Sequence, residues 1–259
     1  MAVLVSPAPP GRAPDLSPPP RRRAPGESPQ VVLDLQRLAR GRDFLDLGVF
    51  EVSPDNTALA YSLDHVGGEN YTLYIKNLGT GVVRSEQIDR VTSAAWSADS
   101  RELVYTVRDD TYRSYALRRC TLGGDDRLIY EEPDPRFDVY VERSRSGEWL
   151  LARSASATTA EVRVARTSAP DGPWTVIAAR EPGHLYDVDH AGDDFYVRTN
   201  RGAPHFRVVA AAEDDPAPRA GGRSSASGPA SPSPTSTRSP AVWPSCSASV
   251  AFRGSSSST

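Results

Sequence analysis

Between residues 31 and 215, apolar and polar positions alternate in short runs separated by Gly, Asn and Asp. A period of two predicts β-strands, because successive side chains of a strand point to opposite faces of the sheet. Helical periodicity is nearly absent, and the only helix that the pattern predicts covers residues 33–40, with Asp34 as its N-cap. The clearest predicted strands are residues 71–78, 101–107, 115–121, 127–130, 149–154, 161–167 and 174–178.

One phrase recurs four times in this region, at intervals of about 45 residues: an apolar strand, a small polar turn and a second apolar strand. The copies begin at Phe50, Ala95, Tyr140 and Tyr186. Several strands in a unit of about 40–50 residues are typical of propeller blades. We therefore predict an all-β fold, a partial β-propeller of about four blades, each a four-stranded antiparallel meander. A blade cannot bury both faces alone, so neighbouring blades must stack.

Composition divides the chain into three segments. The 259 residues carry a formal net charge of -3 and 38% hydrophobic residues, enough for one domain with a core. Residues 1–30 are rich in Pro, Ala and Arg, and residues 216–259 contain no Leu, Ile, Tyr, Asp, Glu or Lys. Such segments cannot offset the entropy of ordering, so we predict disorder at both ends around an incomplete propeller at 31–215. The abrupt change after Asp215 suggests that the tail is translated out of frame.

The sequence offers weak candidates for nucleophilic chemistry. An α/β-hydrolase needs a serine on a glycine-flanked turn between a strand and a helix, and no Gly-x-Ser-x-Gly occurs. Ser146, before Gly147, comes nearest, but its predicted place is a turn between two strands. The pair Asp189 and His190 lacks an activated serine. We therefore assign no catalytic residue.

Metal and carboxylate chemistry are also not favoured. His184 and His190 flank Asp187 and Asp189, but alternation along a strand would place the histidines on one face and the aspartates on the other. Paired aspartates stand in predicted turns, where they hydrogen-bond their own backbone. We therefore predict structural roles, with no metal and no cofactor. The turn pairs are Asp109-Asp110, Asp125-Asp126 and Asp193-Asp194, and the isolated histidines are His65 and His205.

The remaining features bear on compartment and partners. Cys120 and Cys246 are too poorly placed for a framework disulfide and are predicted to be free thiols. The opening apolar run, residues 2–5, is too short for a secretory signal, so we expect a cytoplasmic chain in which Asn70-Tyr-Thr72 is not glycosylated. The Arg21–Arg23 run reads as solvated chain, and we predict neither a nucleic-acid nor a membrane partner. Trp96, Trp149 and Trp174 read as packing residues.

The amino-acid sequence of the repeats points to a narrower group of proteins than the propeller class as a whole. Collinear matches across about 31–215 resemble the propeller of prolyl oligopeptidase family serine peptidases, most of all the oligopeptidase B branch. The matching phrases include Leu45-Asp-Leu-Gly-Val-Phe-Glu-Val-Ser-Pro-Asp55, Glu69-Asn-Tyr-Thr-Leu73, Tyr130-Glu-Glu-Pro-Asp134, Arg143-Ser-Arg-Ser-Gly147 and Tyr186-Asp-Val-Asp-His190.

The resemblance implies a seven-bladed propeller that caps an α/β-hydrolase domain and admits short peptides, which the parent enzyme cleaves after Lys or Arg. This chain matches only the propeller, so we expect it to be inactive alone. A peptide substrate is expected to bind only in the intact parent enzyme. A further expected partner is an α/β-hydrolase domain on a separate chain. An alternative from another class is an independent propeller-like scaffold that binds a partner or completes its ring by association.

Overall fold

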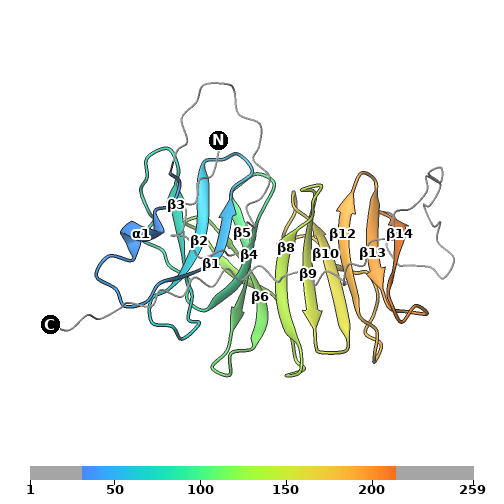
Figure 1. Cartoon of the computed structure of the whole chain (residues 1–259). Helices are drawn as coiled ribbons and strands as arrows, with labels where there is room; N and C mark the ends of the chain where they lie inside the picture. Colours follow the sequence, from blue (N-terminus) through green and yellow to red (C-terminus); the bar gives the residue numbers. More distant parts are fainter. Residues whose placement is uncertain (1–30, 214–259) are drawn as a thin grey trace, which may run out of the picture.

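The computed structural model describes residues 31–213, which form fourteen strands in four antiparallel sheets and one short helix. The sheets follow one another along the chain and stand side by side with their strands running up and down (Figure 1). This arrangement confirms the prediction of an all-β fold built from propeller blades. The predictions of disorder for residues 1–30 and for the tail from residue 216 lie outside the described residues.

Within each sheet, strands hydrogen-bond in chain order. The first sheet contains β1 (Asp46–Val52), β2 (Ala58–Asp64) and β3 (Thr72–Asn77). The second contains β4 (Val91–Trp96), β5 (Glu102–Arg108), β6 (Ser114–Thr121) and β7 (Asp126–Glu131). The third contains β8 (Asp138–Arg143), β9 (Trp149–Ala155), β10 (Ala160–Arg166) and β11 (Thr175–Val176). The fourth contains β12 (Tyr186–Ala191), β13 (Asp194–Thr199) and β14 (Arg207–Ala212).

The prediction of four strands in every blade is wrong for the first sheet. The chain does turn after β3 and return beside it, but residues 82–88 form only the isolated bridges Lys76↔Val83 and Leu73↔Ile88. Its central residues, Arg84-Ser-Glu-Gln87, are polar and exposed, so nothing anchors a regular strand there. The fourth sheet has three strands within 31–213, and a further strand would lie beyond the described residues.

The predicted helix is present but shorter than expected. Helix α1 covers Leu35–Leu38, and the side chain of Asp34 caps it by accepting a hydrogen bond from the Arg37 amide at 2.9 Å. The chain leaves the helix through Gly41, whose φ of +71° is a conformation that glycine adopts without strain.

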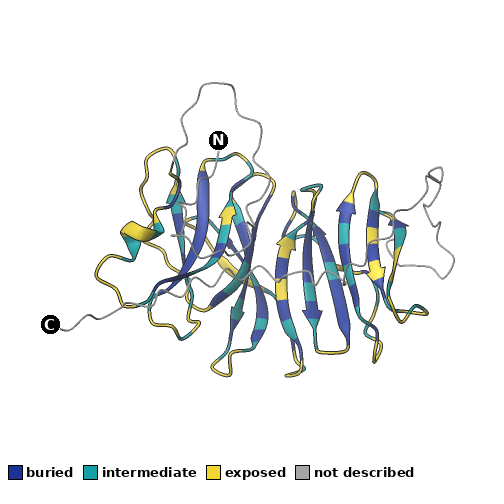
Figure 2. Cartoon of the chain, in the orientation of Figure 1, coloured by how far each residue is buried: buried dark blue, intermediate teal, exposed yellow. Residues whose placement is uncertain are grey.

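The core consists of four clusters of buried side chains, and three of them lie between successive sheets. Trp96 and Leu73 belong to the first junction, Val104 and Leu150 to the second, and Leu151 and Val188 to the third. The fourth cluster covers the outer face of the first sheet, where Val32 and Leu33 pack with β2. Figure 2 shows buried residues along the central strands of each sheet. Stacking therefore buries the faces that one sheet cannot cover.

Hydrogen bonds between sheets repeat with the period of the sequence. Trp96 Nε1 donates to the Glu51 carbonyl oxygen at 2.9 Å, and the Asp55 amide donates to Ser100 Oγ at 3.1 Å. The Val141 amide donates to Ser93 Oγ at 2.8 Å. These bonds join residues 45 to 48 positions apart, so the sequence repeat corresponds to one step from sheet to sheet.

The turn that opens each of the first three sheets has one geometry. The serine that follows the first strand, Ser53, Ser97 or Ser144, accepts a hydrogen bond through its hydroxyl from an amide five residues later. The residue three positions after it has a positive φ: 60° at Asn56, 63° at Ser100 and 77° at Gly147. This shared turn explains why the small polar segment of the repeat recurs.

Candidate functional site at the junction of the third and fourth sheets

Strand β12 places His190 on its buried face and Asp187 and Asp189 on the opposite face, as the alternation predicts, and His184, two residues before the strand, is buried as well. His190 is fully buried and His184 is 4% exposed, whereas Asp187 and Asp189 are half-buried. The aspartates meet arginines, with Asp187 Oδ1 2.9 Å from Arg153 Nε and Asp189 Oδ2 3.0 Å from Arg145 Nε. These four residues therefore do not form one ligand set.

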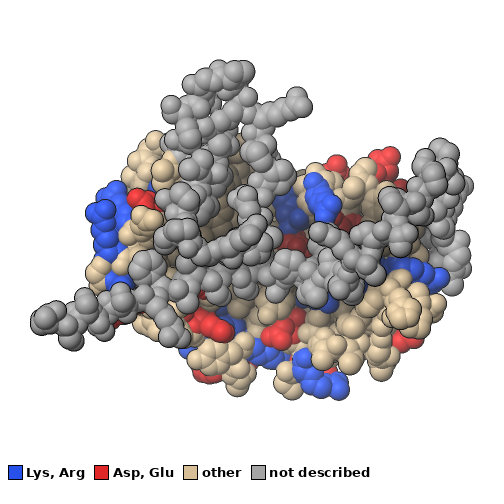
Figure 3. Space-filling view, in the orientation of Figure 1, with Lys and Arg blue, Asp and Glu red and all other residues tan. Residues whose placement is uncertain are grey.

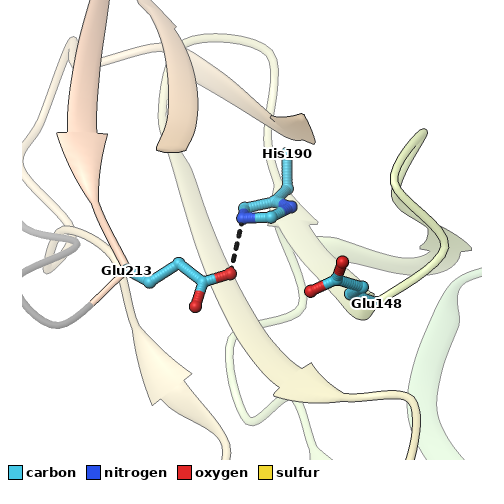
Figure 4. A group of neighbouring side chains, drawn as sticks. All are labelled: Glu148, His190 and Glu213. Carbon is cyan, nitrogen blue, oxygen red and sulfur yellow. Dashed lines mark ion pairs between the residues drawn. The ribbon is translucent and has the colours of Figure 1, made fainter. Parts of the chain in front are cut away.

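The structure instead places His190 between a serine and a carboxylate. Nδ1 of His190 lies 2.8 Å from Ser146 Oγ. Nε2 of His190 lies 2.8 Å from Glu213 Oε1, the contact that is drawn dashed in Figure 4. Ser146 comes from the β8–β9 turn and Glu213 follows β14, so the group joins the third and fourth sheets.

This serine is not positioned as a nucleophile. The Glu148 amide donates to Ser146 Oγ at 3.2 Å, and the Ser144 hydroxyl lies 2.9 Å from the same oxygen. The backbone amides beside it are also engaged: Ser146 N donates to the His190 carbonyl, and Gly147 N donates to the Ser144 carbonyl. Acyl transfer needs backbone donors aimed at a developing oxyanion, and here these donors hold the turn closed. A structural role for Ser146 follows.

Three neighbouring side chains offer donor atoms at a spacing that a metal ion could bridge, because one donor atom of each lies within 4.8 Å of the others: Glu148, His190 and Glu213. Arg166 already supplies the positive charge, with Nη1 3.1 Å from Glu148 Oε2 and Nη2 2.5 Å from Glu213 Oε2. Trp149 Nε1 donates a further hydrogen bond to Glu213 at 3.2 Å. A divalent cation would have to displace this guanidinium, so the donor set fits an ion-pair cluster better than a metal site.

Sequence reasoning did not find this cluster. Glu148, Arg166 and Glu213 come from three different parts of the fold, and no spacing rule relates them to His190. The only signal was the alternation that placed His190 on the inner face of β12.

A second polar cluster joins the second and third sheets. The Glu132 side chain is fully buried and accepts hydrogen bonds from Arg180, Ser154 and Tyr130, with Arg180 Nη1 at 3.0 Å from Glu132 Oε1. Burial alone would raise the pKa of Glu132, but the hydrogen bonds from Arg180 and Ser154 outweigh it and lower the pKa to about 2. Glu132 is therefore held as a carboxylate.

Carboxyl groups also stand on the first strands of the sheets. Glu51 on β1 and Glu142 on β8 are both exposed, and β4 lies between these two strands. Although Glu51 reaches solvent, the surrounding protein desolvates it and raises its pKa to about 7; Arg143 opposes this effect and Glu142 adds to it. Burial also raises the pKa of Glu142, with Asp189 contributing. On the face in Figure 3, acidic and basic side chains are otherwise interspersed.

Two of the paired aspartates do not lie in turns as predicted, because Asp126 begins β7 and Asp194 begins β13. Asp109 accepts hydrogen bonds from the Thr111 and Arg113 amides, so it caps its own turn. Cys120 is buried as a free thiol, and Cys246 lies outside the described residues. Trp96 is 2% exposed, while Trp149 and Trp174 pack against the clusters of later junctions. Asn70 accepts a hydrogen bond from Arg108 at 2.9 Å. The helix described in 31–213 is too short to cross a membrane.

Four stacked antiparallel sheets, each following the previous one by a single repeat, define a β-propeller type of protein. Residues 19–222 match the family model described as "Prolyl oligopeptidase, N-terminal beta-propeller domain". The chain belongs to this family, which confirms the resemblance seen in the repeats.

Similar proteins include "Protease 2" of Moraxella lacunata, which is 37% identical over 186 residues, and "Dipeptidyl aminopeptidase BI" of Pseudoxanthomonas mexicana, which is 38% identical over 194 residues. The alignments cover 70% and 71% of this chain but only 27% and 26% of the relatives. The chain thus spans about a quarter of the length of these relatives and corresponds to their propeller portion.

Solved structures agree with this assignment. Oligopeptidase B from Leishmania major matches with a TM-score of 0.69 and 25% identity, over 75% of this chain and 29% of that one. Oligopeptidase B from Trypanosoma brucei, in a closed form with covalently bound antipain, matches with a TM-score of 0.66 and 28% identity, over 76% of this chain and 29% of that one.

Proposed function

We propose that this chain is the substrate-gating propeller portion of an oligopeptidase B-like serine peptidase that cleaves short peptides after Lys or Arg, and that by itself it is inactive. The observation that carries the proposal is the family match over residues 19–222 together with the oligopeptidase B folds of Leishmania major and Trypanosoma brucei. The engaged backbone around Ser146 supports inactivity, because the nearest serine to a nucleophile lacks oxyanion donors.

The positions of acidic side chains support the proposed preference of the intact enzyme for cleavage after Lys or Arg. The exposed carboxyl groups of Glu51 and Glu142 stand on the first strands of the first and third sheets, on either side of β4, where a cationic peptide on its way through a propeller would meet them. Electrostatic attraction of this kind raises the local concentration of a charged substrate. We also propose that 31–215 is the propeller domain, that the segments on either side are disordered, and that the chain acts in the cytoplasm.

A segment exchange tests the proposal. Residues 31–213 would replace the aligned segment of Moraxella lacunata Protease 2, and hydrolysis of a short peptide amide with Arg before the leaving group would be measured. A control chimaera carries the aligned segment of Dipeptidyl aminopeptidase BI. We expect the exchange to preserve hydrolysis, and we expect the isolated chain to hydrolyse nothing above buffer.

Two results would overturn the proposal. One is a folded but inactive chimaera alongside an active control chimaera. The other is turnover by the isolated chain that Ser146→Ala abolishes. Within the active chimaera, Glu51→Gln with Glu142→Gln should raise KM for the Arg peptide more than for a neutral peptide, whereas Glu131→Gln on the outer strand β7 should not.

A further inference from the structure

Side-chain hydroxyl groups of the second sheet contact the inner edge of β8, the edge that does not pair with β9. Ser114 Oγ donates a hydrogen bond to the Val139 carbonyl oxygen at 2.7 Å, and the Val141 amide donates to Ser93 Oγ at 2.8 Å. The Ser114 amide also donates to Asp138 Oδ1 at 3.0 Å. The first strand of the third sheet is therefore attached to the second sheet through polar groups as well as through the apolar cluster between them.

A bulge in β4 brings two consecutive hydroxyl groups to one place. Successive side chains of a regular strand point to opposite faces, but the register of β4 on β5 shifts at Thr92. Both Thr92 Oγ1, at 2.7 Å, and Ser93 Oγ, at 2.6 Å, lie within hydrogen-bond distance of Thr106 Oγ1. Thr92 Oγ1 lies 2.6 Å from Ser114 Oγ as well. Four hydroxyl groups are thus connected one to the next.

The direction of every hydrogen bond in this group is fixed from one end. A hydroxyl group has one hydrogen to donate and a carbonyl oxygen only accepts, so the hydrogen of Ser114 is committed to Val139. Thr92 must then donate to Ser114, and Thr106 must donate to Thr92. Ser93 in turn donates to Thr106 and accepts from an amide of β8. We call these four side chains the hydroxyl chain, in which each member donates once and accepts once.

We propose that the hydroxyl chain acts as one cooperative unit, which takes the place of strand pairing along β8 and fixes the third sheet to the second. In a parallel sheet, one residue of a neighbouring strand would donate to the carbonyl oxygen before Tyr140 and accept from the amide after it. The hydroxyl chain supplies the same donor to Val139 and the same acceptor to Val141. Both backbone groups are therefore paired, although within residues 31–213 no strand pairs with this edge of β8.

Cooperativity distinguishes the hydroxyl chain from a set of separate contacts. Both of its ends bond to β8, while its members stand on β4, β5 and β6, so the two sheets cannot separate here without breaking it. A hydroxyl group that donates a hydrogen bond becomes a better acceptor, so consecutive bonds strengthen one another. Loss of Ser114 at one end should therefore weaken the bond from the Val141 amide at the other end. Separate bonds would not transmit this loss.

The test is amide hydrogen exchange of the whole protein, followed residue by residue by NMR. Thr106→Val keeps the branched shape of the side chain and removes a hydroxyl from the middle of the hydroxyl chain. Ser114→Ala removes the member that donates to Val139. In both variants the Val141 amide should exchange about fivefold faster than the measured loss of overall stability explains, which is the factor for one hydrogen bond of about 1 kcal/mol. Thr106→Ser keeps the hydroxyl, and its Val141 amide should exchange as in the wild type.

Thr167→Val is the matched control. The Thr167 side chain is also buried, and its hydroxyl donates to the Gly147 carbonyl oxygen at 3.0 Å, outside the hydroxyl chain. This variant should lose stability in urea, but its Val141 amide should exchange no faster than that loss explains. The double variant Thr106→Val with Ser114→Ala should shift the urea midpoint by less than the sum of the two single shifts, because each single change already disrupts the same unit. Far-UV circular dichroism checks that each variant retains its β-structure.

The proposal is overturned if Ser114→Ala leaves exchange of the Val141 amide unchanged, if Thr167→Val accelerates it equally, or if the two single shifts add in the double variant. Should a variant not fold, neutron diffraction from crystals of the wild-type protein decides the matter. The deuterium of Thr106 should point to Thr92, and that of Ser114 should point to Val139. A reversed bond, or a water molecule between two of the hydroxyl groups, would refute the hydroxyl chain.

Discussion

Replacing Arg180 with methionine should destabilise the fold, because it removes the cation that balances the buried Glu132. Methionine keeps an apolar side chain of similar length, so packing against Phe137, which lies 4.0 Å under the guanidinium, changes little. The Glu132 side chain is fully buried, while that of Arg180 is 25% exposed. Removing one partner of a buried pair leaves the other charge uncompensated, and this typically costs about 3–5 kcal/mol.

The pKa of Glu132 gives a second figure of the same size. A fall from the ordinary value of 4.5 to about 2 corresponds to about 3 kcal/mol, at about 1.36 kcal/mol for each pKa unit. Because the folded pKa lies below the unfolded one, this contribution is fully present above pH 4.5 and is lost as the pH falls from 4.5 towards 2. We therefore expect Arg180→Met to lower the free energy of unfolding by about 3 kcal/mol at neutral pH.

The assay is urea unfolding followed by tryptophan fluorescence, at neutral pH and through the acid range. Arg136→Met is the matched control, because Arg136 pairs with Asp134 at 2.6 Å but its side chain is 79% exposed, and such pairs contribute at most about 1 kcal/mol. The double variant Glu132→Gln with Arg180→Met should recover part of the loss. Equal effects of Arg180→Met and Arg136→Met, or an unchanged acid dependence in Arg180→Met, would refute the reasoning.

Three further predictions concern single side chains. Burial, with a further contribution from the charge of Asp126, raises the pKa of the Cys120 thiol to about 11. In a Cys246→Ser variant, a disulfide reagent should therefore react with Cys120 only after denaturant is added. Prompt reaction of the native protein would contradict this prediction. Burial, and to a smaller extent the charge of Arg201, lowers the pKa of His184 below 6.5, so the contribution of neutral His184 to stability is present above pH 6.5 and is lost as the pH falls. The variant His184→Gln should therefore weaken the pH dependence of the urea midpoint between about pH 7 and pH 5. An unchanged pH dependence in this variant would contradict the prediction. Ser146→Ala should cost about 1–2 kcal/mol of unfolding free energy and leave hydrolysis by the active chimaera unchanged, whereas loss of hydrolysis at full stability would make Ser146 catalytic.

Much of the fold could be predicted from the sequence, because each blade is a local structure with its own signals. Alternation located the strands, and the recurring polar turn located the start of each repeat. The split of His190 from Asp189 on β12 followed from the two-residue period of a strand alone. The family followed from the wording of the repeats.

The polar clusters between sheets could not be predicted in this way. Glu132 and Arg180 are 48 residues apart, and the Ser146–His190–Glu213 group draws on three separate segments. Such contacts depend on how the sheets stack and on the rotamers of long side chains, and a pattern along one strand contains neither. The prediction of a fourth strand in the first sheet was wrong at residues 82–88 for a similar reason, because a hairpin turn does not guarantee that the returning segment forms a regular strand.

A crystal structure of the full chain would test the central claim most directly. The account predicts four stacked antiparallel sheets over 31–213, with the Trp96 indole bonded to the Glu51 carbonyl oxygen of the preceding sheet. Sheets that pair in another order, or a helical structure in this region, would contradict it.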